Sequence, residues 1–130
     1  LLIPMLPALA ASLLLFAAQL TTLIGNGSPG LNDQQVNNTY GLVIGPDKAL
    51  YFCDIGSHVV RRYDFKTKKT TIVAGTGKRG FSGSGALATQ ADLNEPYEVR
   101  FDRAGNLYFV DMKNHVVQRV DKKTGILSTV

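Results

Sequence analysis

The fold of this chain is decided by the stretch LYFCDIGSHVVRRYD at residues 50–64, which returns as LYFVDMKNHVVQRVD at residues 107–121. Each residue of the second copy follows its counterpart by 57 positions, and the same offset relates Tyr40 to Tyr97 upstream. A fixed period of this length is typical of architectures that stack one supersecondary unit repeatedly. Residues that recur are therefore expected to build the unit, and residues found in one copy are candidates for an individual function.

Each copy contains four short β segments joined by tight turns. In the second copy Val99 and Phe101 alternate with charged residues, which predicts one apolar face on a strand at residues 98–102. Leu42 and Ile44 take the equivalent core positions in the first copy. Further strands are expected at residues 50–53, 58–63, 70–74, 107–110, 115–120 and 126–130. Four consecutive antiparallel strands form a meander, and repeated four-stranded sheets are the blades of a β-propeller.

Two segments of the second copy, GNLYFVD at residues 105–111 and NHVVQRV at residues 114–120, resemble the NHL repeat. The connector at residues 73–96 is similar to the long glycine-rich, AGTG-type linkers of one NHL subgroup. It departs from that subgroup at residues 84–87, where SGAL replaces the usual DGGP, and Glu98 stands where glycine is usual. The resemblance implies an all-β fold: a partial β-propeller made of about two four-stranded antiparallel NHL-type blades.

The expected organisation follows from the repeat. Residues 21–130 form the propeller part, with blade one at about residues 36–74, a glycine-rich linker at 75–93 and blade two at about 94–130. Propellers close with roughly four to eight blades. Because two blades alone leave apolar faces and edges uncovered, we expect the chain to be a fragment of a longer protein, or to associate with further blades.

Residues 1–20 contain no charged side chain, and the first ionisable residue is Asp33. A largely apolar run of about 20 residues is long enough to span a bilayer as a helix, and a similar run forms the core of a secretory signal. Pro4 and Pro7 favour a signal peptide over a long rigid anchor. We expect an apolar N-terminal helix, cleaved or retained as a membrane anchor, and an extracytoplasmic location (secreted, periplasmic or membrane-anchored).

Composition and charge argue against two classes of function. The net charge is +4, but the basic residues are spread among acidic residues and turns. A nucleic-acid face would cluster them with aromatic residues, so no nucleic-acid partner is expected. The single cysteine, Cys53, corresponds to Val110 in the second copy. We expect it to be a small buried hydrophobic side chain and not a reactive thiol.

Residues 75–80, GTGKRG, match the G-x-G-x-x-G pattern of dinucleotide-binding sites. That function requires the third glycine to open a helix. The residues that follow, FSGSG at 81–85, cannot start a stable helix. The stretch is expected to be a linker, and no cofactor is predicted.

An Asp-x-x-x-His pair occurs in each copy, as Asp54 with His58 and as Asp111 with His115. It suits a metal ligand set or an acid–base pair; alternatively, Asp caps the turn before the third strand and His begins that strand. Because a catalytic group is needed once and a turn-capping carboxylate in every blade, we favour the structural role. The recurrent arginines expected to pair with these carboxylates are Arg62 and Arg119.

Glu98 and Arg100 occur in one copy only and are the first candidates for a ligand site. They lie on the first strand of the blade, which in a propeller is nearest the central channel, the usual ligand end. Tyr40 and Tyr97 precede the first strands and are expected to line the same mouth. The alternative is a local Glu98–Arg100 ion pair without a ligand.

The sequence therefore predicts a binding or protein-interaction scaffold, with an unidentified protein or small-molecule ligand. No catalytic or metal-binding residue is predicted, because the chain has no nucleophile elbow, paired cysteines or His-x-His cluster. The family resemblance implies an alternative, part of a metal-dependent propeller enzyme of the gluconolactonase-like hydrolase or amidating-lyase-like kind. Under that alternative Ca²⁺ or Zn²⁺ would occupy the central channel.

Overall fold

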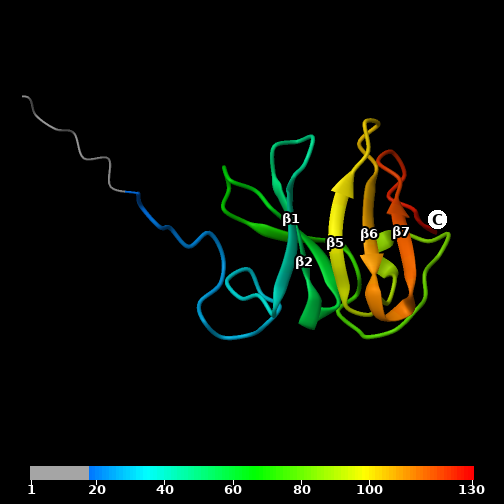
Figure 1. Cartoon of the computed structure of the whole chain (residues 1–130), viewed down its shortest axis with the longest axis horizontal. Helices are drawn as coiled ribbons and strands as arrows, with labels where there is room; N and C mark the ends of the chain where they lie inside the picture. Colours follow the sequence, from blue (N-terminus) through cyan, green and yellow to red (C-terminus); the bar gives the residue numbers. More distant parts are fainter. Residues whose placement is uncertain (1–17) are drawn as a thin grey trace, which may run out of the picture.

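The computed structural model describes residues 18–130, which form two four-stranded antiparallel sheets lying side by side (Figure 1). In each sheet, neighbouring strands are consecutive in the sequence. The prediction of an all-β chain with two four-stranded sheets is confirmed. The first sheet contains β1 (Thr39–Ile44), β2 (Leu50–Asp54), β3 (Val59–Tyr63) and β4 (Thr70–Ala74), and the second contains β5 (Pro96–Phe101), β6 (Leu107–Asp111), β7 (Val116–Val120) and β8 (Leu127–Thr129).

The apolar helix expected at residues 1–20 lies almost entirely outside the described residues. Residues 18–20, which are described, have no regular secondary structure. Among residues 18–130, no helix has the length and apolar character needed to cross a membrane. The signal-peptide or anchor assignment therefore stays a prediction.

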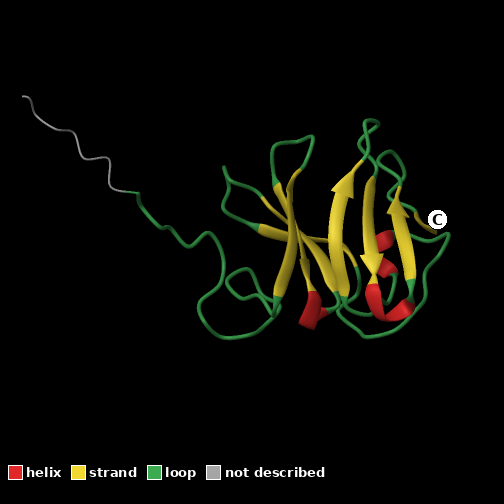
Figure 2. Ribbon diagram, in the orientation of Figure 1, coloured by secondary structure: helices red, strands yellow, loops and turns green. Residues whose placement is uncertain are grey.

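Three 3₁₀ turns accompany the strands (red in Figure 2): η1 (Ile55–Ser57), η2 (Ala88–Gln90) and η3 (Met112–Asn114). The turns η1 and η3 join the second and third strands of the two sheets. Each is followed by a histidine with left-handed backbone, His58 at φ 55° and His115 at φ 58°. Both histidines therefore close a turn just before the third strand, whereas the sequence predicted that they begin that strand.

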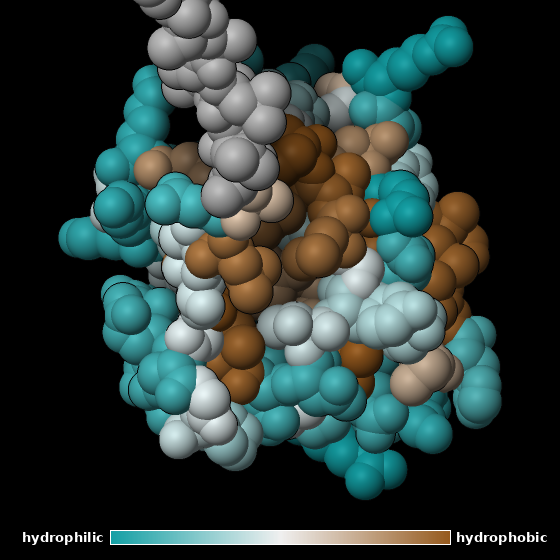
Figure 3. Space-filling view, turned by 60° about the vertical axis from the view of Figure 1, so that its left-hand side comes forward, coloured by the Kyte–Doolittle hydropathy of each residue, from teal (hydrophilic) through white to brown (hydrophobic). Residues whose placement is uncertain are grey.

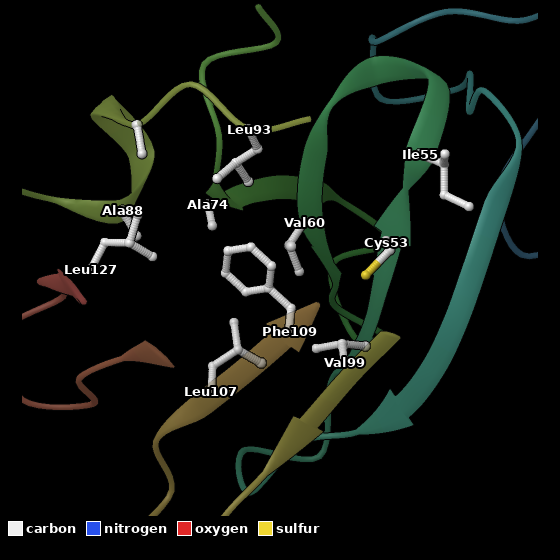
Figure 4. Packing of buried hydrophobic residues seen from close by; sticks show 11 residues of the cluster. Cys53, Ile55, Val60, Ala74, Ala88, Leu93, Val99, Leu107, Phe109 and Leu127 are labelled. Carbon is white, nitrogen blue, oxygen red and sulfur yellow. The ribbon is translucent and has the colours of Figure 1, made fainter. Parts of the chain in front are cut away.

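The main hydrophobic core lies between the two sheets (Figure 4). Cys53 and Val60 enter it from the first sheet, and Val99 and Phe109 enter it from the second, each at most 1% exposed. Burying a phenylalanine side chain stabilises a fold by about 1.5–3 kcal/mol, which makes Phe109 a principal contributor. The connector between the sheets also packs into this core, through Ala88, Ala91 and Leu93.

Equivalent faces of the two sheets differ in their exposure to solvent, and this corrects one prediction. Val99 is fully buried against the first sheet, but its counterpart Leu42 is 64% exposed. Phe101 is half-buried, whereas its counterpart Ile44 is 56% exposed. Leu42 and Ile44 were expected in the core. They are exposed because, among residues 18–130, no further sheet covers their face, and Figure 3 shows apolar side chains gathered on this side of the molecule.

Candidate functional site

The two tyrosines expected to line one mouth do not precede the first strands, as predicted, but lie within them, Tyr40 in β1 and Tyr97 in β5. The packing of β1 beside β5 brings them together. The rings of Tyr40 and Tyr97 stack with their centroids 4.1 Å apart and their planes 21° apart. Tyr40 is 47% exposed, so one tyrosine of the pair is open to solvent. The neighbouring Tyr40 hydroxyl, as a hydrogen-bonding partner, raises the pKa of Tyr97, with smaller contributions from desolvation and from the charge of Glu98. The pair therefore offers a polar-tipped aromatic surface across the junction of the two sheets.

Gly41 explains why the two tyrosines can approach so closely. It sits at a register shift in β1 and has φ +59°, a left-handed conformation that favours glycine. A Cβ atom built on Gly41 would lie 2.7 Å from the Tyr97 carbonyl oxygen and 2.9 Å from the Glu98 Cα. The absence of a side chain at Gly41 thus lets the β5 backbone lie directly against β1.

Glu98 and Arg100 lie on β5 next to the tyrosine pair, and they bind each other. The Arg100 guanidinium donates to the Glu98 carboxylate and, at 2.7 Å, to the Val99 carbonyl. The Arg100 side chain remains 62% exposed. The local ion pair considered from the sequence is therefore present, and it places one carboxylate and one exposed guanidinium beside the exposed aromatic surface. Together Tyr40, Tyr97, Glu98 and Arg100 form what we call the tyrosine patch.

The recurrent aspartates hold the backbone before the first strand of each sheet. The Asp54 carboxylate accepts the backbone N–H of Asn37 at 2.7 Å, and the Asp111 carboxylate accepts that of Asn94 at the same distance. Neither aspartate caps the following 3₁₀ turn with its side chain, so that detail of the prediction was wrong. Burial raises the pKa of both carboxyl groups, although their hydrogen bonds oppose that shift.

The partner of Asp54 is Arg61 and not Arg62. Arg61 donates to the Asp54 carboxylate at 3.0 Å, and the two side chains are 2% and 0% exposed. Arg61 also donates to the backbone carbonyls of Asn32 and Gln35, both at 2.6 Å. Arg61 was not among the predicted site residues, because the second copy carries Gln118 at the equivalent position and the arginine is therefore not recurrent.

The predicted pairing of Arg62 and Arg119 with Asp54 and Asp111 was wrong. Arg62 binds Asp47 at 2.6 Å and Asp64 at 3.2 Å, and Arg119 binds Asp121 at 2.9 Å. These pairs lie at the turns and are partly exposed. Because solvent screens such pairs, these two arginines are minor contributors to stability.

Asp121 is the most strongly perturbed of these turn carboxylates. Hydrogen bonds from the Thr124 backbone, Arg119 and the Lys123 backbone lower the pKa of Asp121 to about 2. The folded value then lies below the ordinary value of 3.8, so the stabilisation is present above pH 3.8 and is lost as the pH falls toward 2. Asp64, its counterpart in the first sheet, also has a lowered pKa, chiefly through the Thr67 and Lys66 backbone N–H groups.

We therefore predict that Asp121→Asn is less stable than the wild type at neutral pH and that this difference disappears as the pH approaches 2. The measurement is urea unfolding of the full-length protein at several pH values. Asp64→Asn is the matched comparison and should show the same direction of change. A difference that stays constant down to pH 2 would contradict the assignment.

His58 connects the two sheets. Its Nδ1 accepts the backbone N–H of Glu95 at 3.2 Å, across the junction. His115, its counterpart, is exposed. Within residues 18–130, no group of three or more His, Cys, Asp or Glu side chains is arranged to hold a metal ion.

Cys53 is fully buried in the core, as expected, and lies opposite Tyr40 in the pairing of β1 with β2. Burial, together with the charge of Glu98, raises the pKa of the Cys53 thiol to about 12. Because the thiolate is the reactive form, we predict that native Cys53 reacts with a disulfide reagent at pH 8 at least about 100-fold more slowly than the unfolded protein. The control is Val110→Cys in a Cys53→Val background, since Val110 is the half-buried counterpart. Equal reaction rates for the two cysteines would contradict this prediction.

Surface hollows occur at equivalent turns of the two sheets. One of about 290 Å³ is lined by residues that include Asp47 and Asp64, and one of about 280 Å³ by residues that include Arg119 and Asp121. Neither is lined by the tyrosine patch. Because they recur with the repeat, they are better explained by the shape of the unit than by an individual ligand.

The fold, the two in-register copies and the stacked sheets define a repeat protein of the all-β class. No protein-family model matches the chain. NHL repeat-containing protein 2 of Gallus gallus is 35% identical over 82 residues, which is 62% of this chain and 11% of that protein. Protein SUPPRESSOR OF QUENCHING 1, chloroplastic, of Arabidopsis thaliana is 29% identical over 85 residues, 65% of this chain and 8% of that protein.

A similar fold is found in the crystal structure of an auxiliary nutrient binding protein from Bacteroides thetaiotaomicron. It superposes with a TM-score of 0.52 and 22% identity, over 68% of this chain and 24% of that protein's chain. The chain thus spans about a tenth of the length of the curated relatives it matches and a quarter of this solved structure. The sequence similarities support an NHL-repeat relationship at low identity, and the structural similarity concerns the fold.

Proposed function

We propose that this chain is part of a binding or protein-interaction scaffold, in which the two sheets are adjacent blades of an NHL-type β-propeller. The observation that carries the proposal is the Tyr40–Tyr97 stack, 4.1 Å between centroids, which joins the first strands of both sheets. Tyrosine combines a large apolar face with a polar tip, which suits recognition of protein and small-molecule ligands. The similarity to NHL repeat-containing protein 2 supports the same class of function.

The tyrosine patch combines an aromatic surface with charged groups. One stacked aromatic surface lies beside a carboxylate and an exposed guanidinium, so a ligand can combine stacking with one or two charge-assisted hydrogen bonds. To bind a ligand, the Arg100 guanidinium must release the Glu98 carboxylate or bind it and the ligand together. Until then, the ion pair holds both side chains in place. The patch is a surface across a sheet junction, which fits a scaffold.

The proposed location is extracytoplasmic, and we assign the chain to the NHL subgroup with long glycine-rich linkers. The uncharged, apolar residues 1–20 support export. The glycine-rich sequence of the connector at residues 75–93 supports the subgroup. Fractionation of cells that produce the full-length protein tests the location, and recovery in the cytoplasm would contradict it.

The scaffold function is tested by placing a photo-crosslinking amino acid at Tyr40 of the full-length protein in living cells. We expect a discrete adduct at Tyr40 and none at Tyr108, a half-buried tyrosine of β6 outside the patch. The partner, once purified, should bind the wild type, with affinity reduced at least about tenfold by Tyr97→Ala, since stacked aromatic anchors carry much of such binding.

Two outcomes would contradict the scaffold function. One is an identical set of adducts at Tyr40 and Tyr108. The other is lactone-hydrolase or lyase turnover that depends on stoichiometric Ca²⁺ or Zn²⁺ in the full-length protein, which would instead support the enzyme alternative.

A further inference from the structure

A further hollow lies at the junction of the two sheets, away from the tyrosine patch. Strands β1 and β5 both start at the lower side of Figure 1, where they carry the patch, and end at the upper side, where the turns at residues 45–49 and 102–106 follow. Two adjoining hollows of about 250 and 200 Å³ open beside these turns, and their shared lining residues are Tyr51, Phe101, Gly105 and Lys122. We call the space that these four residues line the junction groove.

The walls of the junction groove are aromatic and apolar. The Tyr51 ring of β2 meets the Phe101 ring of β5 edge to face, with centroids 4.8 Å apart and planes 82° apart. Val73 of the first sheet and Leu107 and Val120 of the second continue the lining. Binding sites for small molecules are typically apolar clefts with a few polar groups, and both sheets are needed to form this one.

Two carboxylates at the rim of the groove already have cationic partners. Arg62 binds Asp47 at 2.6 Å, and the Tyr51 hydroxyl donates to the same carboxylate at 3.2 Å. Arg119 binds Asp121 at 2.9 Å. The rim is therefore fixed by these contacts, and its negative charge is compensated.

Lys122 is different, because its positive charge is not compensated. Its backbone N–H donates to the Asn106 side-chain oxygen at 3.0 Å, which ties the turn after β7 to the turn after β5. Its side chain lies over Gly105, where an added Cβ atom would be 2.8 Å from the Lys122 Cδ and 3.2 Å from its Nζ. In the described part of the chain, no carboxylate forms an ion pair with Lys122. The ammonium is therefore held at the groove and is available to an anion.

This lining belongs to one junction and is not a general feature of the repeat. At the equivalent positions, 57 residues earlier, the first copy carries Ile44 for Phe101, Lys48 for Gly105 and Phe65 for Lys122. Lys48 has φ 64°, left-handed like Gly105 at φ 88°, so this turn accepts a side chain. The glycine of the second copy is therefore not required by the turn, and it leaves the groove open.

The size and charge of the groove select one kind of ligand. A cavity of about 150 Å³ accommodates benzene, so the hollow of about 250 Å³ has room for one substituted ring. A single lysine is a compact point charge that balances the one negative charge of a carboxylate, whereas a phosphate dianion needs further donors. An aromatic ring with one carboxylate therefore matches both the walls and the cation.

We propose that the junction groove binds a small aromatic carboxylate, whose ring packs against Tyr51 and Phe101 and whose carboxylate accepts hydrogen bonds from the Lys122 ammonium. This site is separate from the tyrosine patch, because the two lie at opposite ends of β1 and β5. The chain thus carries a small-molecule site in addition to the proposed scaffold surface.

Titration of the full-length protein with phenylacetate, followed by ligand-observed NMR, tests the proposal. We expect saturable binding with a Kd of about 1 mM or tighter. Phenylacetamide, which has the same ring and no charge, should bind at least about fivefold more weakly. Equal affinities, or no saturation by about 20 mM phenylacetate, would overturn the proposal. Saturable binding of an amidated apolar peptide without binding of phenylacetate would also overturn it, because the occupant would then be a peptide.

Two lysine variants test whether the groove is the site. Lys122→Gln should weaken phenylacetate binding at least about fivefold and leave phenylacetamide binding unchanged. Lys123→Gln, at the neighbouring exposed position of the same turn, is the matched control and should change neither affinity. Equal effects of the two substitutions would overturn the proposal.

A third variant, Gly105→Lys, copies the first sheet and should fill the groove. It should abolish binding of both compounds while urea unfolding shows that the protein remains folded. Unchanged binding by this folded variant would overturn the proposal. Because none of these measurements uses a partner of the tyrosine patch, failure here is distinguishable from failure of the scaffold function.

Discussion

Replacing Arg61 by leucine should destabilise the full-length protein by about 3–5 kcal/mol, because it leaves the buried Asp54 carboxylate without its charged partner. Asp54 is 0% exposed, and Arg61 is 2% exposed. The substitution also releases the backbone carbonyls of Asn32 and Gln35, to which Arg61 donates at 2.6 Å. The loss therefore reaches the segment that precedes β1, which Arg61 ties to the sheet. Urea unfolding at neutral pH measures the change.

The second sheet supplies the control for this prediction. At the positions of Ser57 and Arg61 it carries Asn114 and Gln118, and the Asn114 side chain donates to the Asp111 carboxylate at 2.7 Å. The double variant Ser57→Asn, Arg61→Gln therefore gives Asp54 a neutral donor set already used in the same protein. It should retain more stability than Arg61→Leu.

The pH dependence of Arg61→Leu provides a second check. Burial already raises the pKa of Asp54, and removal of Arg61 raises it further. A carboxyl group with a raised folded pKa loses stability as the pH rises, so the variant should approach the wild type as the pH is lowered. A loss below about 1 kcal/mol at neutral pH would show that the pair contributes little.

Replacing Gly41 by alanine should destabilise the protein by about 2–4 kcal/mol, through a strained backbone and a clash between sheets. The added Cβ would lie 2.7 Å from the Tyr97 carbonyl oxygen, closer than real Cβ atoms approach backbone. The second sheet must then move, and the tyrosine stack moves with it. Unfolding in urea gives the stability, and the near-ultraviolet circular dichroism of the tyrosines reports the stack.

Gly85→Ala is the matched control. Gly85 has φ +85°, and a Cβ atom there would meet nothing within 4 Å. It should lose only about 1 kcal/mol, from backbone strain without a clash, and leave the tyrosine dichroism unchanged. Equal losses for the two glycines would mean that the approach of β5 to β1 is not constrained at Gly41.

The wrong pairing predicted for the arginines is explained by which face of the strand each side chain occupies. Successive side chains on a strand point to opposite faces. Asp54 is paired with Val59 across the turn, so the residue two positions on, Arg61, shares its face, and Arg62 does not. The register of β2 against β3 across η1 decides which of the two arginines shares a face with Asp54. That register depends on the turn closing at His58. Arg62 was predicted to pair with Asp54 because it recurs in the second copy, but the strand register places Arg61 beside Asp54.

For the tyrosine patch, the sequence selected the residues and only the structure showed how they contact each other. Tyr40 and Tyr97 were selected because they correspond under the repeat and were expected just before the first strands, which was enough to expect them at one mouth. Their stacking was not predictable, because it depends on the close approach of β5 to Gly41. The sequence shows that Glu98 replaces Gly41 in the second copy. It does not show that Gly41 allows β5 to lie directly against β1.

The repeat, the strands, the turns and the burial of Cys53 could be predicted from the sequence, because alternation and turn chemistry act over a few residues and occur in both copies. Which apolar residues are covered could not be predicted, because it depends on how the sheets pack. Leu42 and Val99 occupy the same place in their units, yet one is 64% exposed and the other fully buried. Burial is a property of the neighbouring sheet, and a local pattern specifies only which face of a strand is ready to be covered.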